Sequence, residues 1–217
     1  SRRQRQMCIR DSPEGSVMFP GEPIITVKAP IIECSIIETY LLLSMNFNSL
    51  IATKTNRIVS SARGRLVMEF GARRAQGADA SITGARAAFI SGAPLTSNTY
   101  SSQKYGFKAA GTMAHSWIQA FDSEYEAFKT YARMYPDNCI LLIDTYDTLE
   151  SGLVNAMKVF KEELVPKGLR GGVRIDSGDL AYLSKEVRKR LDENGLKDFT
   201  IVASNSLDEF KIESLLA

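Results

Sequence analysis

The chain has 217 residues but very little histidine or cysteine: one histidine, His115, and three cysteines, Cys8, Cys34 and Cys139. The cysteines are odd in number and far apart, which argues against a disulfide framework or a zinc site and favours a reducing, cytoplasmic environment. No apolar run approaches the roughly 20 residues that a membrane helix needs. The basic start also lacks the apolar core of a secretory signal. We therefore expect a cytoplasmic protein without a membrane partner.

The chain also lacks a large excess of either basic or acidic residues. The formal net charge is +2 and the two signs are interspersed, so the composition gives no reason to expect a nucleic-acid partner. The phosphate-binding pattern GxxxxGK[ST] is absent, which excludes a P-loop enzyme. Apolar residues make up 44% of the chain, enough for a packed core. A lone histidine such as His115 is more often structural than chemical, so its role depends on its surroundings.

The first part of the chain changes character at Pro13. Residues 1–12 contain four arginines and no periodicity, and we predict a disordered or foreign segment there, with a nucleic-acid-binding arm as the alternative. Alternating apolar residues and a Pro-Gly turn between residues 17 and 29 indicate a small β element. Residues 31–57 lack glycine and proline and predict a long helix. One stripe of that helix carries Ile32, Ile36, Tyr40 and Leu43.

From residue 65 onward, short apolar runs alternate with amphipathic helical patterns. Strands are expected within 65–71, 92–98, 109–118, 138–147, 171–178 and 199–205. Helices are expected within 78–91, 123–136, 151–165, 180–195 and 207–217. Such alternation predicts parallel βα units with right-handed crossovers. Their number favours an α/β barrel, and an open doubly wound sheet is the alternative.

Polar residues gather where the apolar runs end, which in an α/β barrel is the rim that carries the chemistry. These residues are Glu69, Phe70, Ser97, Asn98, His115, Asp144, Asp147, Arg174, Asp176, Ser177, Ser204 and Asn205. Taken singly, Asp144 and Ser177 could simply be helix N-caps. Taken together, the set predicts a functional rim.

The residue types on that rim suit a phosphorylated sugar. Guanidinium groups bind carboxylate or phosphate in a fork, and Arg73, Arg74 and Arg174 offer three of them. Carboxylates can orient sugar hydroxyls or hold Mg²⁺ through water. The aspartates in question are Asp144, Asp147 and Asp176. The "DSGD" stretch puts small residues at a helix start, where free N–H groups attract phosphate.

The stretches "EFGARRAQG", "GTMAHSWI", "IDTYDT", "GVRIDSGDL" and "ASNSLDE" resemble, in this order and spacing, the nicotinate phosphoribosyltransferase family. The resemblance covers about residues 13–217. It implies an α/β fold in which residues 65–217 form an incomplete, irregular α/β barrel of parallel strands. Residues 13–64 would then be part of an N-terminal α+β domain. Members of the family are usually dimers, so a homodimer is expected for the full-length protein.

The resemblance also implies a reaction. Nicotinate condenses with 5-phosphoribosyl 1-diphosphate to give nicotinate mononucleotide and diphosphate, coupled to ATP hydrolysis. This is the first step of NAD salvage from nicotinate. Mg²⁺ is the implied cofactor, bound mainly through the substrate rather than by direct protein ligands.

By the same resemblance, His115 is phosphorylated by ATP, and Arg174 and Asp176 contact phosphate and ribose as catalytic residues. Phe70 stacks on the pyridine ring and Arg73 pairs with substrate anions. Ser97 lies near the position where nicotinamide-using relatives carry a carboxylate, and a serine there removes the repulsion of nicotinate. The remaining predicted substrate-binding residues are Asp144, Ser177, Gly178, Ser204 and Asn205.

The family has further segments at both ends, including an aromatic wall for the base and a glycine-rich phosphate loop. We therefore expect the chain to be a fragment with little activity by itself. The alternatives are a nicotinamide or quinolinate phosphoribosyltransferase, an aldolase-like barrel, and a non-catalytic phosphate-binding remnant. The "EFG-x-RRAQG" stretch and Ser97 favour nicotinate, and no strand end offers the lysine that an aldolase needs.

Overall fold

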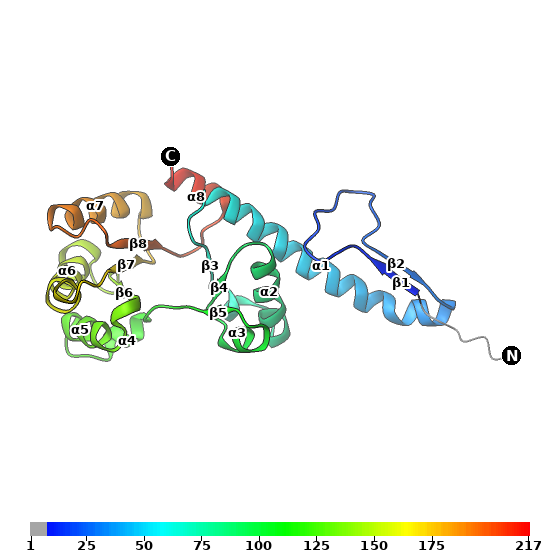
Figure 1. Ribbon diagram of the computed structural model, residues 1–217, viewed down its shortest axis with the longest axis horizontal. Coiled ribbons are helices and arrows are strands. Elements are labelled where there is room, and N and C mark those ends of the chain that lie inside the picture. Colours follow the sequence, from blue (N-terminus) through cyan, green and yellow to red (C-terminus); the bar gives the residue numbers. More distant parts are fainter. Residues whose placement is uncertain (1–7) are drawn as a thin grey trace. The chain divides into compact units, whose positions relative to one another are not determined.

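The computed structural model describes residues 8–217 (Figure 1). Its contacts divide the chain after Ala110 into a first and a second unit, and each is described by itself. The boundary predicted between residues 64 and 65 separates an N-terminal α+β domain from a barrel domain, and it stays a prediction. No helix in the described part of the chain is long and apolar enough to cross a membrane.

The first unit begins with an antiparallel hairpin of β1 (Cys8–Asp11) and β2 (Ile25–Lys28). Residues 8–11 of the segment predicted as disordered or foreign are thus paired in a sheet, and residues 1–7 lie outside the described residues. The foreign origin of that segment stays a prediction. The β element predicted between residues 17 and 29 is reduced to β2. The alternation of Val17 and Phe19 does not form a strand, since turns and irregular structure fill residues 12–24.

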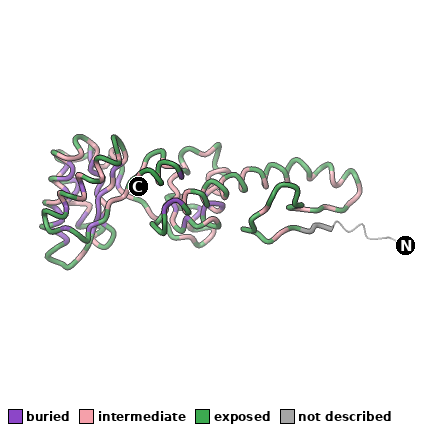
Figure 2. The backbone as a smooth tube through the Cα atoms, turned by 90° about the horizontal axis from the view of Figure 1, so that it is seen from above, coloured by how far each residue is buried: buried purple, intermediate pink, exposed green. Residues whose placement is uncertain are grey.

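Helix α1 (Ile31–Ser61) extends the predicted helix by four residues, and Ala62 is its C-cap residue. Its apolar stripe of Ile32, Ile36, Tyr40 and Leu43 is 67–72% exposed in this unit, and most of the helix is exposed (Figure 2). Nearer its end the helix packs against α2 (Ala78–Ile90). There Gly84 lies beside the Phe47 ring, and a methyl at Gly84 would be in ordinary van der Waals contact with it, at 3.7 Å.

Three very short parallel strands form the sheet of the first unit, in the order β3 (Met68–Glu69), β4 (Leu95–Thr96) and β5 (Lys108–Ala109). Glu69 is opposite Thr96, and Thr96 is opposite Ala109. The 3-10 helix η1 (Ala72–Arg74) and α2 connect β3 to β4, and α3 (Thr99–Tyr105) connects β4 to β5. Helix α3 was not expected; the Asn98 side chain caps it by accepting the Ser101 amide.

The second unit holds a parallel sheet in the order β6 (Cys139–Leu142), β7 (Gly171–Ile175) and β8 (Thr200–Ala203). Helices lie around these strands (Figure 1). They are α4 (His115–Gln119), α5 (Glu124–Met134), η2 (Pro136–Asn138), η3 (Thr148–Gly152), α6 (Leu153–Val159), η4 (Phe160–Leu164), η5 (Val165–Lys167), α7 (Leu180–Glu193) and α8 (Glu209–Leu215).

The core of the second unit lies between the sheet and these helices, where Phe128, Leu141, Phe160 and Leu191 are fully buried. The apolar faces of the helices expected within 151–165 and 180–195 pack against this core. Across both units the chain is mixed α/β with parallel strands, as predicted. The described residues form two open three-stranded parallel sheets and no closed barrel.

The expected strand over residues 109–118 is largely wrong. Pairing of β5 with β4 ends when the Ala110 amide donates to the Thr96 carbonyl, and His115 already begins α4. Residues 110–114 have no regular secondary structure. Met113 and Ile118 are both buried, one before α4 and one within it.

Gly152 fixes the loop that follows β6. A methyl group there would lie 1.9 Å from the Ile143 carbonyl oxygen, far inside van der Waals contact. We expect Gly152→Ala to destabilise the protein by about 3 kcal/mol, because backbone would have to move. Urea unfolding measures the loss. The matched control is Gly111→Ala, since a methyl at Gly111 would meet nothing within 4 Å. Equal stability of the two variants would contradict the close approach.

Candidate active site

Asp144 occupies the centre of the candidate site, two residues after β6. Its side chain is only 1% exposed. One carboxylate oxygen, Oδ1, lies 3.2 Å from His115 Nε2. The other, Oδ2, accepts the Asp176 amide at 3.0 Å and the Ser177 hydroxyl at 2.5 Å. A buried carboxylate needs such partners. Asp144 therefore links three segments, and the helix N-cap considered from the sequence is not its role.

Arg174 holds a second set of side chains together from within β7. Its Nε donates to Ser204 Oγ at 2.8 Å, and Nη1 donates to Thr112 Oγ1 at 2.8 Å. Its Nη2 donates to Asp176 Oδ1 at 2.7 Å. The Ser204 hydroxyl also donates to Asp176 Oδ1, at 2.5 Å. Asp176 thus joins this set to Asp144 through its own backbone amide.

Strand register explains why residues far apart in the sequence meet here. Arg174 lies opposite Leu142 on one side and Val202 on the other. The pairing continues beyond the strands, since the Ile143 amide donates to the Arg174 carbonyl and the Ser204 amide to the Ile175 carbonyl. The carboxyl ends of parallel strands share one edge of the sheet. The sequence-based prediction that these strand ends form one polar rim is met within the second unit.

Asp176 is held in its charged form. Burial raises the pKa of its carboxyl, but the hydrogen bond from Ser204 and the charge and hydrogen bond of Arg174 outweigh burial, and the charge of His115 adds to them. The pKa therefore lies below its ordinary value of 3.8. An anionic Asp176 beside a guanidinium suits the binding of sugar hydroxyls and the neutralisation of developing positive charge.

A depression of about 510 Å³ opens beside this network. Its lining includes Asp176, Ser177, Gly178 and Asn205. Gly178 has a φ of +79°, a conformation that favours glycine. Asn205 has a φ of 84° in the loop after β8, where a left-handed backbone is uncommon for a residue with a side chain. Apart from Asp147, the structure thus places the predicted site residues of the second unit in the network or beside this depression.

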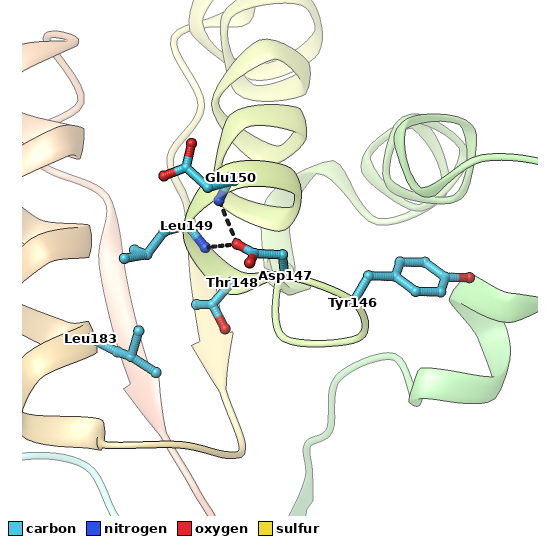
Figure 3. A pocket seen from close by; sticks show the side chains of 6 residues that line it. All are labelled: Tyr146, Asp147, Thr148, Leu149, Glu150 and Leu183. Carbon is cyan, nitrogen blue, oxygen red and sulfur yellow. Dashed lines mark hydrogen bonds between the residues drawn. The ribbon is translucent and has the colours of Figure 1, made fainter.

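A smaller depression of about 330 Å³ lies between the loop after β6 and α7 (Figure 3). Asp147, which lines it, was considered from the sequence as a ligand for sugar or Mg²⁺. Its Oδ1 accepts the amides of Leu149 at 3.0 Å and Glu150 at 2.7 Å. Asp147 is therefore the N-cap of η3, and this capping explains why an acidic residue stands there.

The other predicted site residues belong to the first unit. Phe70 directly follows β3 and is half-buried, and Ser97 directly follows β4 and is exposed. The Ser97 amide donates to the Glu69 carbonyl at 3.0 Å, which keeps the two strand ends side by side. Arg73 lies exposed on η1, three residues after Phe70. These residues lie at the polar edge of the first unit's sheet.

Sequence reasoning missed two contributors. Thr112 accepts a hydrogen bond from Arg174 across 62 residues of sequence, and no local pattern marks such a contact. Glu69 was noted only as a polar residue at a strand end, but its carboxylate bonds to Thr96 at 2.6 Å. A signal for Glu69 existed, because an acidic side chain after a short apolar strand needs a donor nearby.

The geometry can now be compared with known proteins. Residues 66–217 match the model of the nicotinate phosphoribosyltransferase (NAPRTase) family. The chain belongs to this family. Every predicted site residue lies within the matched range.

Curated nicotinate phosphoribosyltransferases agree with this assignment. One from Mycobacterium tuberculosis is 48% identical over 206 residues, which cover 95% of this chain and 44% of the relative. One from Bacillus subtilis is 48% identical over 204 residues, which cover 94% of this chain and 41% of the relative. The chain thus spans less than half the length of these relatives.

Solved structures give the same picture. The crystal structure of human nicotinic acid phosphoribosyltransferase matches with a TM-score of 0.86 and 29% identity, covering 97% of this chain and 53% of that one. A structure described as nicotinate-nucleotide pyrophosphorylase from Pyrococcus furiosus matches with a TM-score of 0.81 and 31% identity, covering 94% and 53%.

The His115–Asp144 contact predicts a tautomer. With the ring N–H on Nε2 facing the Asp144 carboxylate, the neutral imidazole leaves Nδ1 unprotonated. ¹⁵N NMR of histidine-labelled protein measures this without ambiguity, because the chain has one histidine. We expect Asp144→Ala to give a mixture of tautomers. Asp147→Ala is the control, since Asp147 bonds instead to Leu149 and Glu150. A neutral ring protonated on Nδ1 in the parent protein would contradict the geometry.

Proposed function

We propose that the protein is a nicotinate phosphoribosyltransferase that makes nicotinate mononucleotide and diphosphate from nicotinate and 5-phosphoribosyl 1-diphosphate, with hydrolysis of ATP. The observation that carries the proposal is the contact of His115 with the buried Asp144, joined to Arg174 and Asp176 in a chain of the matching family. The test is synthesis of the mononucleotide by the full-length protein, with nicotinamide and quinolinate as competing bases. Phosphate binding without turnover would support the phosphate-binding alternative instead.

The reaction needs positioning more than covalent chemistry. The ring nitrogen of nicotinate forms a bond to ribose C1, and the bond from C1 to the diphosphate oxygen breaks, with its electron pair leaving on diphosphate. Positive charge builds on the sugar in between. Asp176, held anionic, can stabilise that charge and orient ribose hydroxyls, and Arg174 can bind phosphate oxygens beside it. The network around Asp144 fixes both groups before substrate arrives.

His115 is proposed to accept the γ-phosphoryl group of ATP. Its side chain is 41% exposed, while its partner Asp144 is buried. With Nε2–H turned to Asp144, the lone pair of Nδ1 is available to attack phosphorus as ADP leaves. Asp144 would also stabilise the positive charge that the ring gains in the process. Hydrolysis of the phosphohistidine would then complete the ATP-coupled cycle.

The remaining substrate contacts are assigned by residue type. Phe70 is proposed to stack on the pyridine ring, Arg73 to pair with the carboxylate of nicotinate, and Ser97 to admit that carboxylate without repulsion. A final group, around the depression of the second unit, is proposed to bind ribose and diphosphate. It consists of Asp144, Ser177, Gly178, Ser204 and Asn205.

Mg²⁺ is proposed to be held mainly by diphosphate oxygens. Across residues 8–217, no three histidine, cysteine or acidic side chains are grouped so that they could hold a metal ion. Bound there, the ion would neutralise charge on the leaving diphosphate. A homodimer of the full-length protein and a cytoplasmic location stay predictions.

Removal of His115 should separate the two reactions. We expect His115→Asn to abolish acid-labile, base-stable labelling from γ-³²P ATP and to abolish stimulation by ATP. Slow synthesis of the mononucleotide without ATP should remain, because Arg174 and Asp176 are unchanged. The measurement is phosphohistidine labelling beside product formation in the full-length protein. Label that persists in the variant would place the phosphoryl group on another residue and rule out His115 as its carrier.

Removal of Arg73 should weaken nicotinate selectively. A hydrogen bond to a charged group contributes about 2 kcal/mol, so Arg73→Ala should raise the Kd for nicotinate about thirtyfold. Affinity for neutral nicotinamide should change little. Arg65→Ala, which removes another exposed arginine of the same unit, is the matched control. Calorimetry on the full-length variants measures both bases, and an unchanged nicotinate Kd would remove Arg73 from the site.

A further inference from the structure

Glu69 uses both carboxylate oxygens to join the two strand ends of the first unit. Oε1 accepts the amide of Gly71, the residue after Phe70. Oε2 accepts the hydroxyl of Thr96, the residue before Ser97, at 2.6 Å. The two residues proposed to contact the base, Phe70 and Ser97, are thus each beside a residue that this carboxylate holds.

The first bond closes a tight turn around Phe70. Glu69 and Gly71 flank Phe70 in sequence, and the bond between them fixes the backbone on both sides of the ring. Gly71 is also the N-cap residue of η1, the 3-10 helix that carries Arg73. Its carbonyl accepts the Arg74 amide at 2.9 Å. A methyl at Gly71 would lie 3.0 Å from Glu69 Oε1, closer than most such contacts, so glycine suits this position.

The second bond does the same for Ser97. Thr96 is only 2% exposed. Its hydroxyl donates to Glu69 and accepts the Asn98 amide at 3.0 Å. Ser97 is therefore flanked by two residues bonded to each other, as Phe70 is. The backbone bond from the Ser97 amide to the Glu69 carbonyl, at 3.0 Å, adds a further link between the two turns.

We propose that Glu69 is a positioning residue that fixes the distance between the Phe70 ring and Ser97 and so shapes the nicotinate pocket. The inference rests on the proposed function. It also explains how the Glu69 carboxylate can lie near the proposed pocket for nicotinate, which is itself an anion. With both oxygens bonded to the protein's own donors, its charge is compensated locally and it is not free to meet the substrate.

Substitutions can distinguish the hydrogen bonds of Glu69 from its negative charge. Glu69→Gln removes the charge but keeps an oxygen for the Gly71 amide and an NH₂ group that can donate to the Thr96 hydroxyl. Glu69→Ala removes both bonds. Thr96→Val keeps the shape of a buried side chain and removes only the bond on the Ser97 side. Glu162→Gln is the matched control, because Glu162 lies in the second unit and pairs with Lys129 there.

Steady-state kinetics of the full-length protein give the first readout. We expect Glu69→Ala to raise the KM for nicotinate about tenfold, as the loss of hydrogen bonds to a charged group predicts. The KM for 5-phosphoribosyl 1-diphosphate and kcat should stay nearly unchanged, and Glu69→Gln should restore the nicotinate KM. A merely structural role would lower Tm and the active fraction, and hence apparent kcat, without a selective change in the nicotinate KM.

Amide hydrogen exchange gives a second readout that needs no activity. Glu69→Ala should speed exchange at Gly71 and at Asn98, whereas Thr96→Val should speed it at Asn98 alone. A parent enzyme that turns over nicotinate while Glu69→Ala keeps the parent KM would overturn this inference and leave the proposed function intact. A parent that makes no nicotinate mononucleotide would overturn the proposed function. Exchange at Gly71 and Asn98 would then decide alone whether Glu69 orders the two turns, and unchanged rates would refute it.

Discussion

The buried carboxylate of Asp144 is the interaction on which the second unit's chemistry depends. It ties the start of α4, the end of β6 and the loop after β7 to one point, through His115, the Asp176 amide and Ser177. An unpartnered buried charge is strongly unfavourable, so its three donors hold one another in place. The orientation of the His115 ring and the position of Asp176 thus both depend on the Asp144 carboxylate.

At each of the two polar edges, one carboxylate accepts hydrogen bonds from more than one segment of the chain. In the first unit a carboxylate at the end of β3 holds donors on its own turn and on the neighbouring strand end. In the second, the carboxylate after β6 does so across to β7 and α4. Each edge thus has its backbone ordered by an acidic side chain whose oxygens are bonded within the protein, while Arg73 and His115 are more exposed.

Much of this organisation could be read from the sequence, because its signals are local. Apolar runs marked β6, β7 and β8, and the amphipathic pattern of residues 180–195 marked α7, whose apolar face packs against the core. Polar residues at strand ends predicted a shared edge. The helical turn at His115 was missed, because a short apolar stretch suits either period. The bond from Arg174 to Thr112 could not be foreseen, since it depends on tertiary placement. The helical period of the apolar stripe on α1 likewise could not show that this stripe is exposed in the first unit.

The hydrogen bonds of the second unit's site join residues distant in sequence: His115 and Asp144 are 29 residues apart, Asp144 and Ser177 are 33 apart, and Thr112 and Arg174 are 62 apart. Closing such loops is slow and unfavourable until sheet pairing compensates for the lost chain entropy. The site therefore cannot assemble ahead of the β6–β7–β8 sheet. A partly folded chain carries these side chains without their arrangement, so any binding that needs the complete network would arise only after this sheet has formed.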